Sequence, residues 1–421
     1  MSLLTTITRN FLTRSFKPFT FTNDYDSVLD YENLQNLGLY IHIPFCKSIC
    51  SFCPYCKELY SEEKCSRYID YLIREIHMVV SKDGKAENGR KTVTSLYFGG
   101  GTPALAHKRL GEIISAVNEH FIITEGIGVE LHPDNVTEDI LLSLKEAGVT
   151  KISIGIQSFQ NKYQKILGRK PVDSKSLKEV LSKVPFETVS FDFIFALPRQ
   201  TYEELKSDVD AAFECGANHI AIYPFIDFSF ATSGIPVMKK NEKRKLLDDI
   251  TNYCLGKGFE RSSIWTFSNK PDARYSSMTR DNFLGFGCSA TTLLKDSFKI
   301  NTFSVDEYIA RIEKHELPTS LTIRFSRRQR MLYYLFWTAY STKVDSVQFE
   351  NFFSVPLKKM YGFEAKLAKL FGFVTESNGI YKMTLKGAFF YHYYENYYTL
   401  AYIDKMWNLM RNTPFPEGLK L

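Results

Sequence analysis

Three cysteines have a spacing that suits metal chemistry. Cys46, Cys50 and Cys53 follow the pattern C-x3-C-x2-C, directly after the apolar run 39–45. A short loop at the end of a strand lets three thiolates converge on one point. Thiolates are the general ligands of iron–sulfur clusters, and soft sulfur ligands select such metals. Three thiolates on a four-iron cube would leave one iron without a protein ligand.

Zinc is the alternative metal that these thiolates could bind. A structural zinc ion takes four ligands, usually as C-x2-C pairs separated by a dozen or more residues. Cys53 and Cys56 form one such pair, but the sequence offers no second pair and no neighbouring histidine pair. The cysteine pattern therefore favours a [4Fe–4S] cluster. Its open iron could chelate the amino and carboxylate groups of S-adenosylmethionine, whose reductive cleavage yields a 5′-deoxyadenosyl radical.

The elements that position this loop alternate between strands and helices. Apolar runs at 38–43, 93–98, 129–131, 151–156, 189–195 and 219–224 alternate with amphipathic stretches at 67–80, 108–120, 138–147, 176–182 and 202–214. Continuous apolar runs indicate parallel strands that are buried on both faces. We therefore predict an α/β fold, a partial (β/α)6 TIM-like barrel whose functional residues follow the carboxyl ends of the strands.

The remaining sequence predicts further regions. Residues 1–36 form an N-terminal arm, 37–235 the partial barrel, 236–318 an extension that completes the site, and 319–421 a C-terminal, mostly helical module. In that module, helices at 327–340 and 364–371 precede a short strand at 380–383, which is typical of a winged-helix-like unit. Its last segment, 389–410, is strongly aromatic and could stack on a planar ligand, although a packed terminal helix is the simpler interpretation.

Composition excludes several classes of protein. The 421 residues are 44% hydrophobic and 24% charged, which is ordinary for a globular chain. A net charge of +6 is too mild to indicate nucleic-acid binding, and no apolar run reaches the ~18 residues that a membrane span needs. Cysteines crowded in this way suggest metal binding in a reducing compartment. We expect a cytoplasmic protein; residues 1–22 resemble a transit peptide only loosely.

Several motifs, in order, carry a resemblance to a known family. They are Tyr40-Ile-His-Ile-Pro-Phe-Cys, Ser51-Phe-Cys, Tyr97-Phe-Gly-Gly-Gly-Thr-Pro, Val129-Glu-Leu-His-Pro, Ile154-Gly-Ile-Gln-Ser-Phe, Leu167-Gly-Arg, Phe191-Asp-Phe-Ile-Phe-Ala-Leu-Pro, Tyr275-Ser-Ser-Met-Thr-Arg and Leu284-Gly-Phe-Gly-Cys-Ser-Ala. Over about residues 38–292 the chain thus resembles the radical S-adenosylmethionine (SAM) superfamily. Within it, the chain is similar to the branch of oxygen-independent coproporphyrinogen III oxidase.

The resemblance implies a set of cofactor-binding residues. It assigns Cys46, Cys50 and Cys53, hereafter the cluster cysteines, to a [4Fe–4S] cluster, and it implies one or two molecules of SAM. The positions near the first molecule are Tyr40, Gly100, Glu130, Ile226 and Thr291. The positions near the second are Phe52, Gly101, Thr102, Gln157, Arg169 and Asp192. No catalytic residue is assigned.

The resemblance also implies an activity. It is that of a radical SAM oxidoreductase, a coproporphyrinogen dehydrogenase that oxidises a tetrapyrrole-type substrate in porphyrin and haem metabolism. Its electron donor would be reduced flavodoxin or ferredoxin. Decarboxylating members carry a further cysteine two residues after the third ligand, whereas Cys56 follows Cys53 by three. A radical methyltransferase, a cyclopropane-forming enzyme, a haem chaperone and an anaerobic haem-degrading enzyme therefore stay open as alternatives.

Overall fold

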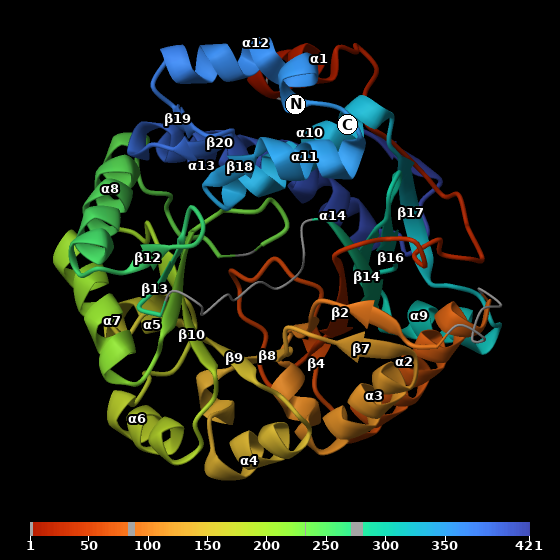
Figure 1. The fold of residues 1–421 in the computed structure, drawn as a ribbon. Helices are drawn as coiled ribbons and strands as arrows, with labels where there is room; N and C mark the ends of the chain where they lie inside the picture. The colour runs from red at the N-terminus through yellow and green to blue at the C-terminus, as the bar shows by residue number, and fades with distance from the viewer. Residues whose placement is uncertain (1–2, 83–88, 232, 271–280) are drawn as a thin grey trace.

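A computed structural model describes residues 3–82, 89–231, 233–270 and 281–421 (Figure 1). The motif that begins at Tyr275 lies outside the described residues. The rest of the chain forms a large mixed sheet with helices along one side and a helical region across the top (Figure 1).

Six neighbouring parallel strands form the centre of the sheet, in the spatial order β11, β10, β9, β8, β6, β2. Their bounds are β2 (Leu37–Ile43), β6 (Leu96–Gly100), β8 (Ile127–Leu131), β9 (Lys151–Gln157), β10 (Thr188–Phe195) and β11 (His219–Pro224). The connecting helices are α2 (Glu62–Lys82), α3 (His107–His120), α4 (Glu138–Glu146), α5 (Asn161–Ile166), α6 (Ser174–Lys183) and α7 (Tyr202–Glu214). The prediction of a partial α/β barrel is confirmed.

The sheet continues beyond these six strands on both sides. Next to β11 lie the antiparallel strands β13 (Thr266–Ser268) and β12 (Glu260–Arg261). Next to β2 lie β14 (Asn282–Phe286), β15 (Thr291–Leu293), β16 (Ser297–Asn301), β17 (Thr319–Arg324), β1 (Thr20–Thr22) and β21 (Gly418–Lys420). Within the described residues the sheet ends at β12 and β21 and does not close into a barrel.

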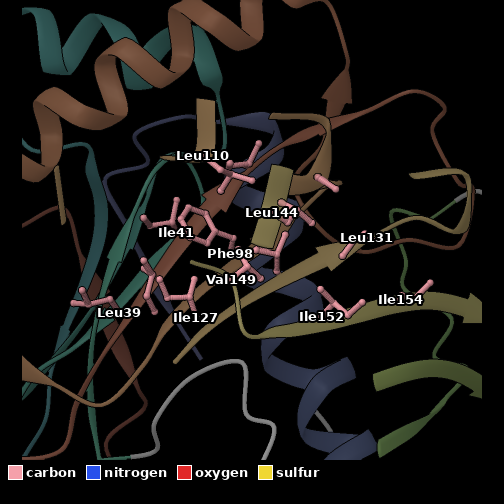
Figure 2. Close-up of a cluster of buried hydrophobic side chains, with 14 of the residues drawn as sticks. Leu39, Ile41, Phe98, Leu110, Ile127, Leu131, Leu144, Val149, Ile152 and Ile154 are labelled. Carbon is pink, nitrogen blue, oxygen red and sulfur yellow. The ribbon is translucent and has the colours of Figure 1, made fainter. Parts of the chain in front are cut away.

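The core lies between the parallel strands and their outer helices. Figure 2 shows Ile41 from β2 and Phe98 from β6 near Leu110 of α3 and Leu144 of α4; each of these side chains is almost completely buried. Burial of apolar surface stabilises the fold by about 25 cal/mol per Å². This packing fixes the strands, and their carboxyl ends thereby become a rigid base for the loops that follow them.

The C-terminal module lies above those loops (Figure 1). Its helices are α10 (Arg327–Tyr340), α11 (Ser346–Phe353), α12 (Leu357–Leu370), α13 (Leu385–Tyr398) and, after a π-helical turn at Thr399–Ile403, α14 (Asp404–Asn412). A small antiparallel sheet joins β18 (Lys343–Asp345), β20 (Ile380–Met383) and β19 (Val374–Ser377). The helices with this sheet agree with the predicted winged-helix-like unit.

The other elements complete the molecule. They are α1 (Leu3–Thr13), β3 (Phe45–Cys46), β4 (Glu58–Leu59), β5 (Lys91–Val93), β7 (Phe121–Ile123), α8 (Lys240–Gly256) and α9 (Val305–Glu313). Among the described helices, none combines the length and the apolar character that crossing a bilayer requires.

Candidate functional site

A cavity of about 1560 Å³ lies between the carboxyl ends of the strands and the C-terminal module. The three cluster cysteines line it, together with nearly all the other predicted cofactor-binding residues: Phe52, Gly100, Gly101, Thr102, Glu130, Gln157, Arg169, Asp192, Ile226 and Thr291. The fold therefore brings together positions that span about 250 residues of sequence. Tyr40 is the exception, because it does not line the cavity.

The cluster cysteines are half-buried on the loop that follows β2. Burial, together with the neighbouring Cys53 and Cys50, raises the pKa of Cys46 to about 11, and Thr102 opposes this shift with a hydrogen bond from its hydroxyl to the Cys46 sulfur at 3.8 Å. A thiol in this setting loses its proton only when a cation compensates the charge, as a bound metal does. Lys57 supports the loop by donating a hydrogen bond to the carbonyl of Cys53.

The glycine-rich loop after β6 lies directly against the cluster loop. The amide of Gly101 donates to the carbonyl of Ile43 at 2.9 Å, and the amide of Thr102 donates to that of Phe45 at 2.8 Å. A Cβ atom on Gly101 would lie 2.9 Å from the Cys46 sulfur. Glycine at this position leaves the space that the first cluster cysteine occupies, and it lets the two loops pair through their backbones.

Cys56 faces away from the cavity. Its side chain is buried and its thiol donates to the carbonyl of Phe303 at 3.0 Å. Its sulfur lies within 4.8 Å of ligand atoms of His42 and Cys288. In this buried group the His42 nitrogens already contact the Tyr40 hydroxyl at 3.0 Å and the Cys56 carbonyl at 3.1 Å.

The arrangement of sulfurs weighs against a single zinc ion. Two groups of possible ligands among the described residues have all their ligand atoms within 4.8 Å of one another, and the cluster cysteines are in neither. A tetrahedral zinc ion lies about 2.3 Å from each sulfur, so its sulfur ligands must lie close to one another. A cube of four irons, with one cysteine on each of three corners, fits a wider spacing.

Two partly buried carboxyl groups line the same cavity. Burial raises the pKa of Glu130 on β8, although its oxygens accept hydrogen bonds from the Tyr97 hydroxyl at 3.0 Å and the Gly100 amide at 3.2 Å. Burial also raises the pKa of Asp192 on β10 to about 7, and Ser153 donates to it at 2.8 Å. A cation that enters the cavity would favour the ionised form of both groups, so they suit the ammonium or sulfonium of SAM.

Gln157 and Arg169 occupy the next position around the barrel. Gln157 ends β9 with φ of 69°, a left-handed conformation that is uncommon outside glycine and occurs often at functional sites. The guanidinium of Arg169 lies 5.8 Å above the Phe52 ring and donates to the carbonyl of Gly155. Its Nε is buried and has no hydrogen-bond partner within the described part of the chain. That donor is a candidate contact for an anionic group.

Of the last three predicted positions, Ile226 and Thr291 line the cavity and Tyr40 does not. Ile226 follows β11, and Thr291 begins β15 on the other side of the sheet. Tyr40 lies behind the wall, where its ring stacks on Tyr97 with centroids 6.4 Å apart and an interplanar angle of 14°. Tyr40 therefore supports Tyr97, the residue that holds Glu130.

The structure adds three residues that the sequence analysis did not assign. Tyr97 and Ser153 position the two carboxyl groups, and both had a local signal: Tyr97 opens the glycine-rich motif, and Ser153 shares a strand face with Gln157 because side chains alternate along a strand. Arg411 of α14 donates to the carbonyl of Pro54 in the cluster loop. No local pattern connects these two residues, which are separated by 357 positions.

This combination of fold and site defines a class. Residues 40–212 match the model of the radical SAM superfamily, so this part of the chain is a radical SAM domain, as the motifs predicted. Proteins of this superfamily use a [4Fe–4S] cluster and SAM, which are therefore the cofactors of this domain. The chain's own residues fit both groups through the half-buried cysteines, the space at Gly101 and the paired carboxyl groups.

The chain is similar both to heme chaperones and to coproporphyrinogen III oxidases. The chain is 25% identical over 295 residues to the heme chaperone HemW of Bacillus subtilis, covering 66% of this chain and 76% of the relative. It is 28% identical over 313 residues to the oxygen-independent coproporphyrinogen III oxidase of Cereibacter sphaeroides, covering 67% and 68%. The solved structure of coproporphyrinogen III oxidase (HemN) from Escherichia coli matches with a TM-score of 0.73 at 20% identity, over 89% of this chain and 93% of that chain, which supports the fold.

Proposed function

We propose that this protein is a radical SAM oxidoreductase that acts on a tetrapyrrole-type substrate, with coproporphyrinogen III as the first substrate to test. The observation that carries the proposal is that one continuous cavity joins the cluster cysteines to a large aromatic wall. Similarity to the coproporphyrinogen oxidases supports it.

The dimensions of the cavity support a large substrate beside the cofactor. Pockets for drug-sized ligands measure about 300–1,000 Å³, whereas this cavity measures about 1560 Å³. The C-terminal module supplies aromatic side chains to its upper wall, among them Tyr333, Phe336, Tyr340, Tyr394 and Tyr398. Such rings can stack on a planar or partly planar macrocycle.

Basic side chains in the same cavity suit an acidic substrate. Arg9, Lys47, Arg169, Arg261 and Lys343 contribute to its lining. Guanidinium groups bind carboxylates through paired hydrogen bonds, and propionate side chains are carboxylates. Arg330 of α10 does not line the cavity; it is buried and donates to the backbone carbonyls of Leu294 and Asp281.

The chain's own groups have distinct parts in the proposed reaction. When bound, the cluster and SAM supply a radical able to remove hydrogen from an unactivated carbon. Glu130 and Asp192 would hold the cationic cofactor in place, and Gln157 and Arg169 would orient its polar groups. The C-terminal helices exclude water and present a propionate carbon of the substrate. Loss of that hydrogen and of carbon dioxide, with transfer of the remaining electron to an external one-electron acceptor, leaves a vinyl group.

The test is an anaerobic turnover assay. Cluster-loaded protein is incubated with SAM, reduced flavodoxin and coproporphyrinogen III, and the products are separated by mass. The proposal expects the amount of vinyl product to rise in proportion to the amount of 5′-deoxyadenosine. Release of 5′-deoxyadenosine without a vinyl product from any tetrapyrrole would refute the substrate, and S-adenosylhomocysteine among the products would indicate methyl transfer.

Haem delivery is the second candidate, and similarity to a heme chaperone favours it. His392 is a poor haem ligand, because it is buried, does not line the cavity and accepts a hydrogen bond from the Trp265 indole at 3.2 Å. A chaperone would bind haem stoichiometrically and pass it to an acceptor without consuming SAM. Haem titration followed by transfer to an apo-acceptor distinguishes this activity from turnover.

A further inference from the structure

A second group of metal-ligand side chains lies outside the cavity. His77 belongs to α2, and Glu119 and His120 end α3. The ligand atoms of these three side chains all lie within 4.8 Å of one another. None of the three lines the cavity.

The ligand atoms of this group are arranged much as they would be around a coordinated ion. His77 Nδ1 and His120 Nε2 are 3.1 Å apart, so the two imidazoles share one proton at most. One carboxylate oxygen of Glu119 lies 3.9 Å from His77 Nδ1 and 4.0 Å from His120 Nε2. Two imidazole nitrogens and one carboxylate oxygen suit zinc and other divalent first-row transition metals.

The group is both accessible and suited to a cation. The side chains of His77, Glu119 and His120 are 42%, 61% and 23% exposed, so an ion can reach them from solvent. An ion would replace the shared proton between the rings and bring the carboxylate into contact.

The group lies at the ends of α2 and α3 that point away from the cavity. The helix α2 follows the cluster loop, and α3 follows the glycine-rich loop, with its first residue, His107, near the cavity end of the sheet. Both histidines lie toward the other ends of these helices. In α/β barrels that opposite face serves stability, whereas chemistry occurs at the carboxyl ends of the strands.

We propose that His77, Glu119 and His120 form a zinc-type divalent metal site that links α2 to α3 at the face of the barrel opposite the cavity. The ion takes three protein ligands and completes its coordination with water. It ties together the outer ends of the two helices whose inner ends begin at the cluster loop and the glycine-rich loop. This site does not depend on the proposed substrate.

Zinc titration calorimetry on the cluster-loaded protein tests the site. Loading the cluster first keeps its cysteines from competing for zinc. The wild type is expected to bind one more equivalent of zinc than the double variant His77→Gln/His120→Gln, and zinc should raise the melting temperature of the wild type but not that of the double variant. His315→Gln is the matched control, because His315 is exposed and belongs to neither ligand group of the described residues.

X-ray absorption at the zinc edge identifies the ligands. With one equivalent of zinc, the spectrum should show nitrogen and oxygen neighbours only, and Glu119→Gln should weaken binding while leaving the cluster spectrum unchanged. Equal zinc stoichiometry in the wild type and the double variant would overturn the site. So would sulfur neighbours around the bound zinc, or binding only at millimolar zinc.

Discussion

Substituting Gly101 tests how the cluster loop is built. A Cβ atom at this position would lie 2.7 Å from the carbonyl oxygen of Phe45 and 2.9 Å from the sulfur of Cys46. Ordinary contacts measure about 3.5–4.0 Å, so Gly101→Ala must displace the sulfur by roughly 0.6 Å or more. The backbone cannot move aside freely, because the Gly101 amide is bonded to Ile43. Metal–ligand distances tolerate only about 0.2 Å.

We therefore expect Gly101→Ala to fold but to retain much less iron than the wild type after anaerobic reconstitution. Gly111→Ala is the matched control, because its Cβ would meet nothing within 4 Å and the position is a partly exposed one of α3. There, alanine should stabilise the helix by about 0.5–1 kcal/mol. Iron analysis and electron paramagnetic resonance of the reduced protein measure the outcome. Full iron content with an unchanged spectrum in Gly101→Ala would refute the reasoning.

Three further predictions concern the same site. Alanine at any one cluster cysteine should abolish the brown chromophore, whereas Cys56→Ala should keep it because that buried thiol contacts Phe303; loss of iron from Cys56→Ala, measured after reconstitution, would contradict this ligand assignment. Burial raises the pKa of Asp192 to about 7, so its proton must leave when the cationic cofactor binds. Affinity for SAM should therefore rise between pH 5 and pH 7, by up to about tenfold per pH unit, and calorimetry should show a flatter profile for Asp192→Asn. Arg411→Gln removes a positive charge beside the cluster loop and should lower the cluster midpoint potential by tens of millivolts, on the order expected for one partly screened charge. Arg411→Lys should restore most of it in a redox titration, and equal potentials in all three proteins would count against an electrostatic role.

Local patterns predicted the parts of the fold that local forces determine. The apolar runs became the six parallel strands, and the expected helix at 327–340 and strand at 380–383 match α10 and β20. Hydrophobic periodicity reports which face a segment buries, and it needs no knowledge of distant partners. The resemblance, rather than periodicity, pointed to Gly101, and backbone hydrogen bonds join its loop to the loop of the cluster cysteines.

Long-range contacts were beyond that reasoning. The short strands β15 and β16 are stable because they pair with each other and with β14 and β17, and pairing of this kind leaves a weak mark on each segment alone. Cys56 is three residues from Cys53, yet its thiol points to Phe303, which belongs to a distant part of the chain. His77 and His120, 43 positions apart, meet only because α2 and α3 pack side by side.

The contact of Arg411 with Pro54 has a consequence for how this protein can change. The helices that shape the upper wall of the cavity also contact the loop that carries the cluster cysteines. In addition, the ring centroids of Tyr55 in that loop and Trp407 of α14 lie 5.9 Å apart. A substitution that adapts the wall to a new ligand therefore also disturbs the loop that binds the iron–sulfur cluster. Divergence of ligand preference in this chain is mechanically tied to the retention of its iron.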